Sequence, residues 1–176
     1  MTTVQTTIDS PVGPLRLVAD DDALVAVFFA DHRPAPTIVA RTVTRHAVLD
    51  RAAEQLAEYF AGSRRRFDLP LDPQGTEMQR RVWQALATIP FGTTTSYGAL
   101  AAAIGRPGSA RAIGHANARN PLSIVLPCHR VLGSAGALTG YAGGTDRKRW
   151  LLVHETSGTS VARVRPDPSC TASPPR

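Results

Sequence analysis

The chain has 176 residues, of which 43% are hydrophobic and 19% charged, and its net charge is +6 at neutral pH. These values are typical of a globular protein with one ordinary domain or two small ones. No apolar run reaches the ~20 residues that cross a bilayer, and the first residues lack the basic and apolar segments of a signal peptide. We therefore expect a cytoplasmic protein that does not enter membranes. The positive charge suits a polyanion such as DNA, although charge by itself is weak evidence.

The two cysteines, Cys128 and Cys170, are too few for a disulfide framework, and they form no C-x-x-C pair. The five histidines are scattered along the chain without the spacing of a zinc site. The sequence therefore predicts no metal.

The first part of the chain, residues 1–72, predicts a small α+β domain. Turn residues separate three β-rich segments, at 3–8, 15–19 and 24–29. Residues 30–45 are ambiguous. Apolar residues on one face predict a helix between His46 and Gly62, and a short strand is expected at 67–71. The face of that helix contains Val48, Ala52, Leu56 and either Tyr59 or Phe60.

A linker-like segment, 72–75, precedes a second predicted domain over residues 73–157. Thr76 and Gln79 fit a capping box at the start of a helix that Pro90 closes.

Two short helices are then expected, the first over 97–104 with Ser96 as its cap and Gly105 at its end. Ser109 is expected to cap the second, over 110–119. Two short helices joined by a tight, Gly-containing turn predict a helix-turn-helix, although two merely packed helices would give the same pattern.

A short buried strand, 122–126, is expected to lead into the segment Pro127-Cys128-His129-Arg130. A Gly-rich stretch, 133–144, precedes a last helix over about 146–155. Residues 158–176 have little to bury and predict a disordered tail, in which Cys170 is expected to have no role.

Cys128 is the candidate for chemistry. A lone cysteine after an apolar segment is often a small buried hydrophobe, but His129 and Arg130 follow it, and a thiol needs a nearby base or positive field to become a nucleophile. Neighbours in sequence need not touch in space, so both interpretations stay open at this point.

The helix at 110–119 is rich in Ala and Gly, and Arg111 and Arg119 are its only long basic side chains. Small side chains allow a close approach to a narrow groove, so this helix suits the minor groove better than base reading in the major groove. Asn120 could simply end the helix. Glu155, near the end of the last helix, is unfavourable for the helix dipole, which favours a special role.

Residues 120–155 closely resemble the O6-alkylguanine-DNA alkyltransferases. The likeness rests on Pro-Cys-His-Arg at 127–130, on Gly-Tyr at 140–141 and on His-Glu at 154–155, in that order. Thr76-x-x-Gln and Ser96-Tyr97 extend it. It is strong over 76–157, weak over 1–72, where residues 9–13 are the main similarity, and absent from the tail.

This resemblance implies an α+β protein with a ribonuclease-H-like first domain without catalytic residues and a winged-helix-like second domain. It implies direct repair of DNA: Cys128 takes a methyl or small alkyl group from guanine oxygen-6, with thymine oxygen-4 as a second candidate. His129 would take the thiol proton through a water, Glu155 would stabilise the imidazolium, and Asn120 would orient the active-site turn. The thioether product cannot be hydrolysed, so each molecule acts once and needs no cofactor.

The resemblance also implies a partner, double-stranded DNA, bound through its minor groove with the alkylguanine flipped out. Arg111 would fill the gap, and Tyr97 would press on the phosphate. The protein would be a monomer that can cluster on DNA. The implied substrate-binding residues are Tyr97, Val131, Tyr141, Ala142 and Gly143. The implied DNA-binding residues are Tyr97, Gly98, Ala110, Arg111, Gly114, Arg119 and Ser134.

Three features depart from the family pattern. Some relatives have a serine donor after the pocket tyrosine, where this chain has Ala142, so the guanine oxygen must rely on backbone N–H groups. Thr-Pro-Phe at the start of the first helix is replaced by Thr76-Glu-Met78. First-domain cysteines, which hold a structural zinc in some relatives, are missing here.

Three other functions compete. A non-catalytic damage sensor on the same scaffold would lack the nucleophile, and Cys128 is present. A winged-helix transcription regulator would carry more base-reading side chains than the helix at 110–119 offers. A thiol hydrolase using Cys128 and His129 would turn over repeatedly.

Overall fold

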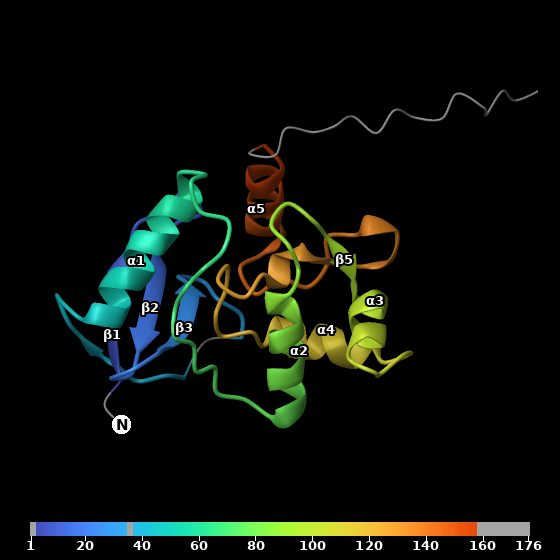
Figure 1. Cartoon of the computed structure of the whole chain (residues 1–176), viewed down its shortest axis with the longest axis horizontal. Helices are drawn as coiled ribbons and strands as arrows, with labels where there is room; N and C mark the ends of the chain where they lie inside the picture. Colours follow the sequence, from blue (N-terminus) through green and yellow to red (C-terminus); the bar gives the residue numbers. More distant parts are fainter. Residues whose placement is uncertain (1–2, 35–36, 158–176) are drawn as a thin grey trace, which may run out of the picture.

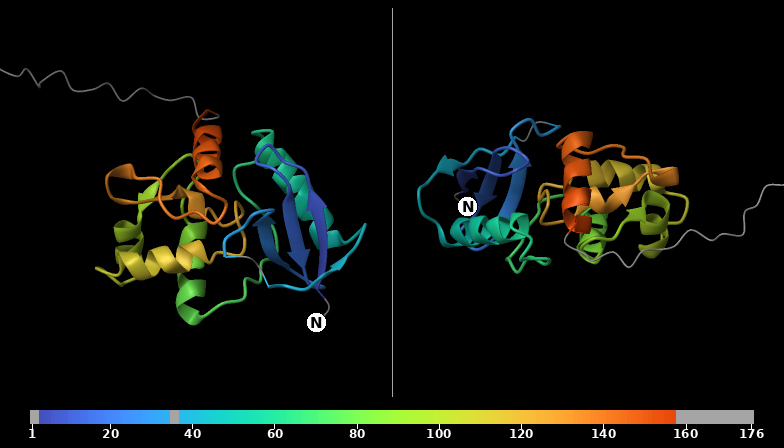
Figure 2. Two further views of the ribbon diagram at one scale, coloured as in Figure 1. Left: turned by 180° about the vertical axis from the view of Figure 1, so that it is seen from behind. Right: turned by 90° about the horizontal axis from the view of Figure 1, so that it is seen from above.

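The computed structural model describes residues 3–34 and 37–157; the predicted tail, with Cys170, lies outside this part of the chain. A sheet with one helix forms the N-terminal half, and a helical half lies beside it (Figure 1). The last helix, α5 (Thr145–Ser157), lies near the boundary of the two halves in the views from behind and from above (Figure 2). Within the described residues, no helix has the length and apolarity to span a bilayer.

The sheet has the order β3-β2-β1-β4, and its strands confirm the three predicted ones. β1 (Val4–Ile8), β2 (Leu15–Ala19) and β3 (Leu24–Phe29) are antiparallel neighbours. The ambiguous segment contributes β4 (Arg41–Thr42), which runs parallel to β1. All six residues of β3 are buried, so this strand lies inside the molecule although it ends the sheet.

Two passing segments cover the outer edge of β3. The Leu24 amide donates to the Pro70 carbonyl at 2.9 Å, and the Val27 amide donates to the Pro121 carbonyl at 2.8 Å. The strand predicted at 67–71 is therefore wrong, because its contact with β3 is a single bridge at Leu71. These bonds satisfy backbone groups that would otherwise be open at a sheet edge.

The buried strand predicted at 122–126 is also wrong. Leu122 makes one bridge with Val27, and the chain then turns, with the Leu126 amide donating to the Leu122 carbonyl at 2.9 Å. Ile124 has φ +72°, a left-handed conformation that a β-branched residue rarely adopts. The segment is apolar because it crosses the core, not because it pairs in a ladder.

Helix α1 (Ala47–Phe60) packs on one face of the sheet, as the apolar face predicted. Ala52, Leu56 and Tyr59 of the predicted face are buried, whereas Val48 is only partly buried and its neighbour Leu49, which the prediction left out, is buried instead. Of the two aromatic residues that could complete this face, Tyr59 is fully buried and Phe60 is only partly buried.

Helix α2 (Glu77–Ala87) has the predicted capping box: Thr76 Oγ1 accepts from the Gln79 amide, and the Gln79 side chain accepts from the Thr76 amide. Helix α3 (Tyr97–Ala103) is capped by Ser96, as predicted, and Gly105 follows it with φ +72°.

Helix α4 (Ala110–Ala118) packs on α2 and α3. The predicted cap at Ser109 is wrong, because its side chain makes no capping bond and its backbone, at φ −93° and ψ 24°, is not extended as a cap requires.

The segment that begins at Cys128 pairs with the strand that precedes the helix-turn-helix. A short 3-10 turn, η1 (Cys128–Arg130), leads into β6 (Val131–Leu132), which pairs in parallel with β5 (Thr95–Ser96). A second 3-10 turn, η2 (Ser134–Gly136), follows. Because α3 begins directly after β5, this small sheet fixes the position of α3 relative to Cys128.

Candidate functional site

Cys128 begins η1 and is 2% exposed. Asn120, two residues after the end of α4, donates from Nδ2 to the Cys128 sulfur at 3.1 Å and to the Leu126 carbonyl at 2.9 Å. Its Oδ1 accepts from the Leu122 amide at 3.0 Å. One amide side chain therefore holds both ends of the buried turn and the sulfur that follows it.

The surroundings of Cys128 leave its thiol protonated at rest. Burial raises the pKa of the Cys128 thiol, and the Asn120 hydrogen bond and the positive charge of Lys148 oppose this rise only in part. A thiol in this setting becomes a nucleophile when a base takes its proton.

His129 is fully buried, and its two ring nitrogens differ. Nε2 lies 2.7 Å from Glu155 Oε1, while Nδ1 has no hydrogen-bond partner among the described residues. Because the partner of Nε2 is a carboxylate, Nε2 carries the proton and Nδ1 has the free lone pair. Burial lowers the pKa of His129, and Glu155 only partly counters this effect. The imidazole is thus neutral and able to accept a proton at Nδ1.

Glu155 accepts hydrogen bonds on both carboxylate oxygens. Arg130 donates from Nε to Oε2 at 2.8 Å and from Nη2 to Oε1 at 2.9 Å. The Gly92 amide donates to Oε2, and Tyr59 Oη donates to Oε1. Burial alone would raise the pKa of Glu155, but the bonds from His129 and Arg130 hold it well below its usual range. Glu155 is therefore a carboxylate at every pH at which the protein works.

The structure brings together all four side chains expected from the sequence to do chemistry: Asn120, Cys128, His129 and Glu155. It adds two that the sequence reasoning did not place there, Arg130 as the ion-pair partner of Glu155 and Tyr59 from the other half. The signal for Arg130 was its position in the Pro-Cys-His-Arg motif. Tyr59 gave no signal beyond an apolar helix face.

Lys148 is a further buried charge that the sequence reasoning missed. Its Nζ donates to the Val131 carbonyl at 2.6 Å and to the Thr139 carbonyl at 3.0 Å, so it connects β6 to the middle of the Gly-rich stretch. Lys148, Leu151 and Glu155 are buried on one side of α5. Charged residues at positions i and i+7 with an apolar one between them were the signal available in the sequence.

The expected pocket residues Tyr141, Ala142 and Gly143 lie against β3. A Cβ atom at Gly143 would lie 2.5 Å from the Phe29 ring, so only glycine fits without displacing that ring. The Tyr141 and Phe29 ring centres are 5.7 Å apart, and the buried Tyr141 hydroxyl has no partner among the described residues.

The N-terminal half also holds the backbone of this loop. The Arg33 amide donates to the Ala142 carbonyl at 3.0 Å. Arg147 places its guanidinium 5.1 Å from the Phe29 ring centre and donates from Nη1 to the Gly143 carbonyl at 2.8 Å and to Asp31. The shape of the loop thus depends on both halves of the molecule.

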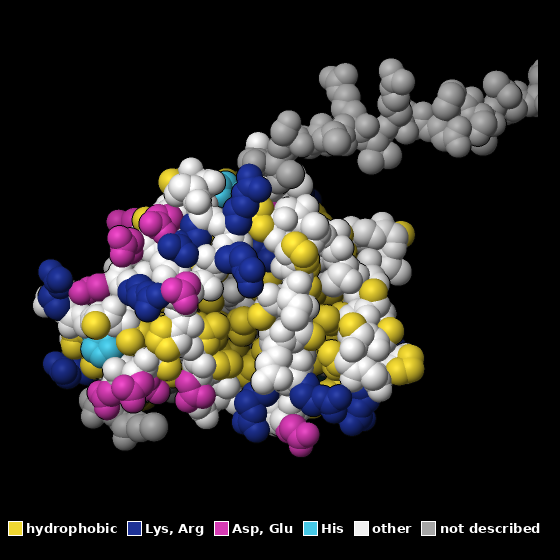
Figure 3. Space-filling view, viewed as in Figure 1, with side chains coloured by type: hydrophobic (Ala, Val, Ile, Leu, Met, Phe, Trp, Pro, Cys, Tyr) yellow, Lys and Arg dark blue, Asp and Glu magenta, His cyan; other side chains and the backbone are white. Residues whose placement is uncertain are grey.

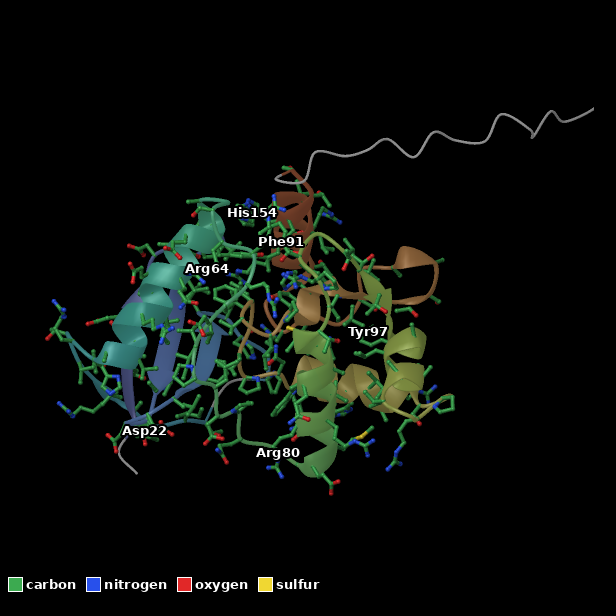
Figure 4. The ribbon with its side chains drawn as sticks, viewed as in Figure 1. Asp22, Arg64, Arg80, Phe91, Tyr97 and His154 are labelled. Carbon is green, nitrogen blue, oxygen red and sulfur yellow. The ribbon has the colours of Figure 1, made fainter. Side chains whose placement is uncertain are left out.

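The expected DNA-binding residues lie on the helix-turn-helix and the loops beside it. Arg111 and Arg119 are exposed and line a surface cavity of about 640 Å³ between α2 and α4, together with His115. Basic side chains gather at the lower edge of the view, where Arg80 lies in the first turn of α2 (Figures 3 and 4).

Tyr97 is half-buried between α4 and the Gly-rich stretch (Figure 4). Its hydroxyl lies 3.4 Å from the Thr139 carbonyl and accepts from Asn117 at 3.5 Å, and its ring would touch a Cβ at Gly114. Gly98 and Ser134 are exposed, and Ala110 is partly so.

Two family models together match most of the chain. Residues 3–73 match the ribonuclease-like domain of 6-O-methylguanine DNA methyltransferase, and residues 77–157 match the DNA binding domain of the same protein. Fold and site thus define a two-domain protein in which a sheet and a helical DNA-binding module enclose a buried cysteine. The chain belongs to the 6-O-methylguanine DNA methyltransferase family, which confirms the resemblance and the α+β fold predicted from the sequence.

Individual relatives agree with the family models. A methylated-DNA–protein-cysteine methyltransferase of Mycolicibacterium paratuberculosis is 51% identical over 149 residues, covering 85% of this chain and 90% of that protein. One from Salmonella typhimurium is 47% identical over 158 residues, covering 84% and 92%. The Mycobacterium tuberculosis protein OGT, solved in complex with DNA, has a TM-score of 0.81 and 45% identity, covering 90% of this chain and 94% of that one.

Proposed function

We propose that this protein repairs DNA by transferring a methyl or small alkyl group from guanine oxygen-6 to Cys128, once per molecule. The observation that carries the proposal is the group around the sulfur. The buried Cys128 thiol accepts a hydrogen bond from Asn120. The next residue, His129, has a neutral imidazole whose Nε2 is held by the Glu155 carboxylate. An alkyl group on thymine oxygen-4 is a second candidate substrate, which Cys128 would attack in the same way.

The proposed reaction is an in-line displacement. His129 Nδ1 takes the Cys128 proton through a water, and Glu155 stabilises the imidazolium that results. The thiolate attacks the alkyl carbon, the bond from that carbon to oxygen-6 breaks, and guanine leaves and is protonated. The new thioether has no step that restores the thiol, so no cofactor is needed and one turnover follows.

The guanine is proposed to bind beside Tyr141 and the backbone of Ala142 and Gly143, with Val131 as a further residue of the pocket. Ala142 has no side-chain donor, so oxygen-6 relies on backbone N–H groups. The Phe29 ring that fixes Gly143 supports this arrangement, because it holds the loop backbone in one place.

The proposed partner is double-stranded DNA, approached through its minor groove, with the alkylguanine flipped out and Arg111 in the gap. The support is the exposure of Arg111 and Arg119 on a helix otherwise made of small residues. Flipping costs a few kcal/mol, less at a weakened base pair. The protein is proposed to act as a monomer that can cluster on DNA, in the cytoplasm at the nucleoid.

The test is incubation with a duplex that carries one O6-methylguanine, followed by mass spectrometry of peptides. We expect a single added methyl on Cys128, none on Cys170, and a ratio of one methyl per protein at excess DNA. The Cys128→Ser variant is the control and should gain nothing. An unmodified Cys128 beside intact substrate would exclude the transfer, and more than one product per protein would favour the hydrolase.

A further inference from the structure

Tyr59 connects the N-terminal half to the proposed chemistry. It lies in the last turn of α1, it is 0% exposed, and its hydroxyl donates to Glu155 Oε1 at 2.9 Å across 96 positions of sequence. The same Oε1 accepts from His129 Nε2 at 2.7 Å. One oxygen atom therefore joins Tyr59 to the base beside Cys128.

The direction of the Tyr59 hydroxyl is fixed on several sides. Its ring centre lies 5.6 Å from Phe67, 6.1 Å from Phe91 and 5.2 Å from His154. The His154 ring nitrogen Nε2 is also 2.8 Å from the Tyr59 carbonyl, so adjacent residues of α5 hold the backbone and the side chain of Tyr59. Figure 4 shows Phe91 and His154 near the upper ends of α1 and α5.

The hydroxyl remains a donor at all working pH values, because burial and the nearby Glu155 carboxylate raise the pKa of Tyr59 far above its usual value. A hydrogen-bond donor on a carboxylate oxygen stabilises its negative charge and so weakens its interaction with any other donor. Glu155 Oε1 accepts from Tyr59, His129 and Arg130 together. Tyr59 therefore limits how strongly Glu155 can stabilise a protonated His129.

We propose that Tyr59 is a positioning residue for the alkyl transfer, whose hydroxyl holds Glu155 Oε1 and so moderates the basicity of His129. This proposal rests on the proposed function, in which His129 must be neutral to accept the thiol proton. It gives the N-terminal half a part in the chemistry, beyond the ribonuclease-H-like scaffold without catalytic residues that the resemblance implies.

The charged and titratable groups around His129 must be considered together. Glu155 and Lys148 face it from α5, Arg130 from η1, and Tyr59 from α1 by way of Glu155. The Tyr141 ring centre is 6.5 Å away. Among these groups, Tyr59 can lose its donor with almost no change of shape and no change of net charge, which makes it the cleanest one to alter.

The experiment measures the rate at which Cys128 reacts with free O6-benzylguanine as a function of pH, in the wild type and in Tyr59→Phe. Without the hydroxyl, Oε1 gives more charge to His129, the imidazolium is favoured, and the base is neutral only at higher pH. The midpoint of the acidic side of the profile should rise by roughly half a unit, with a rate loss that is largest at low pH. Superimposable profiles would overturn the proposal.

Two further variants separate positioning from loss of packing. Phe60→Leu loosens the neighbouring ring without touching Glu155 and should leave the midpoint unchanged; an equal shift there would refute the role of the hydroxyl. Fluorotyrosine at position 59 keeps the ring and strengthens the donor, so it should move the midpoint to lower pH, and it remains informative if Tyr59→Phe folds poorly. A wild type that does not react at Cys128 would overturn the proposed function itself, whereas a reactive wild type with no shift overturns only this inference.

Discussion

Cys128 can react only when a base accepts the proton of its thiol, and individual side chains around the sulfur control this transfer. Burial disfavours the thiolate, Asn120 favours it by donating to the sulfur, and His129 offers a free Nδ1. A buried hydrogen bond to a charged acceptor is stronger than the same hydrogen bond to a neutral acceptor. The contact from Asn120 therefore has a larger effect on the thiolate than on the thiol.

Asn120→Ala should raise the pKa of the Cys128 thiol, because burial then acts with one donor fewer. The rate of reaction with O6-benzylguanine at neutral pH should fall roughly tenfold, because less of the thiol is present as thiolate. Thiolate absorbance during a pH titration, in a Cys170→Ser background, measures the shift. Asn117→Ala is the control, since Asn117 donates to the Cys128 carbonyl rather than to its sulfur; an equal pKa shift in both variants would contradict the explanation.

At the scale of elements, periodic segments were predictable and irregular ones were not. α1, α2 and α3 follow from their apolar faces and caps, and β1 to β3 follow from their turn-bounded β-rich segments. The segment 122–126 is apolar throughout, and burial without periodicity does not distinguish a strand from a buried turn. Its actual shape depends on a hydrogen bond to the Asn120 side chain and on a bridge to Val27 at the edge of β3. The first contact follows no periodic pattern, and the second joins residues that are far apart in the sequence.

Helix α4 gives a prediction about DNA. Arg111→Ala should slow repair of a methylated duplex by roughly tenfold or more, because no side chain then fills the gap that the flipped base leaves in the duplex. The reaction with free O6-benzylguanine should stay nearly unchanged. Both rates are measured on the same preparation. Arg45→Ala removes an equal charge from an exposed pair in the N-terminal half and should change neither rate much. Equal losses on both substrates would rule out the proposed role of Arg111.

The loop at 140–144 gives a second prediction at this scale. Gly143→Ala places a methyl 2.5 Å from the Phe29 ring, so the loop must move and the reaction with O6-benzylguanine should slow by tenfold or more, on the order expected for a misplaced pocket. Reaction of Cys128 with methyl iodide should change little. Adding Phe29→Leu should restore part of the rate, with Phe29→Leu alone as the control. A Gly143→Ala variant with full activity would show that the Phe29 contact does not shape the pocket.

At the scale of the whole molecule, the two halves meet around the reactive centre. Tyr59 and Arg33 reach from the first half to Glu155 and Ala142, and Arg147 reaches back to Asp31. The ion pair of Glu155 with Arg130 lies at this boundary and is almost fully buried. Breaking a buried pair from one side leaves an uncompensated charge, which costs about 3–5 kcal/mol.

Glu155→Gln should therefore lower the free energy of unfolding by about 3–5 kcal/mol at neutral pH. The folded-state pKa of Glu155 is depressed, so its contribution is fully present above its unfolded value of about 4.3 and is lost as the pH falls below it. The difference between wild type and variant should therefore shrink in acid. Denaturant unfolding from neutral pH to pH 3 measures this. Glu58→Gln removes an exposed pair with Arg64 and should cost less than about 1 kcal/mol.

The sequence by itself determined the family and the strands and helices with regular periodicity, and it predicted a reactive site made of Asn120, Cys128, His129 and Glu155. Motifs and periodic patterns are local, so they can be read from one chain. Only the tertiary structure decided that Glu155 pairs with Arg130, that Tyr59 shares its Oε1, and that Phe29 fixes Gly143. These contacts join residues 25, 96 and 114 positions apart. The last two cross between the halves, and they form because buried apolar residues of both halves pack in one core.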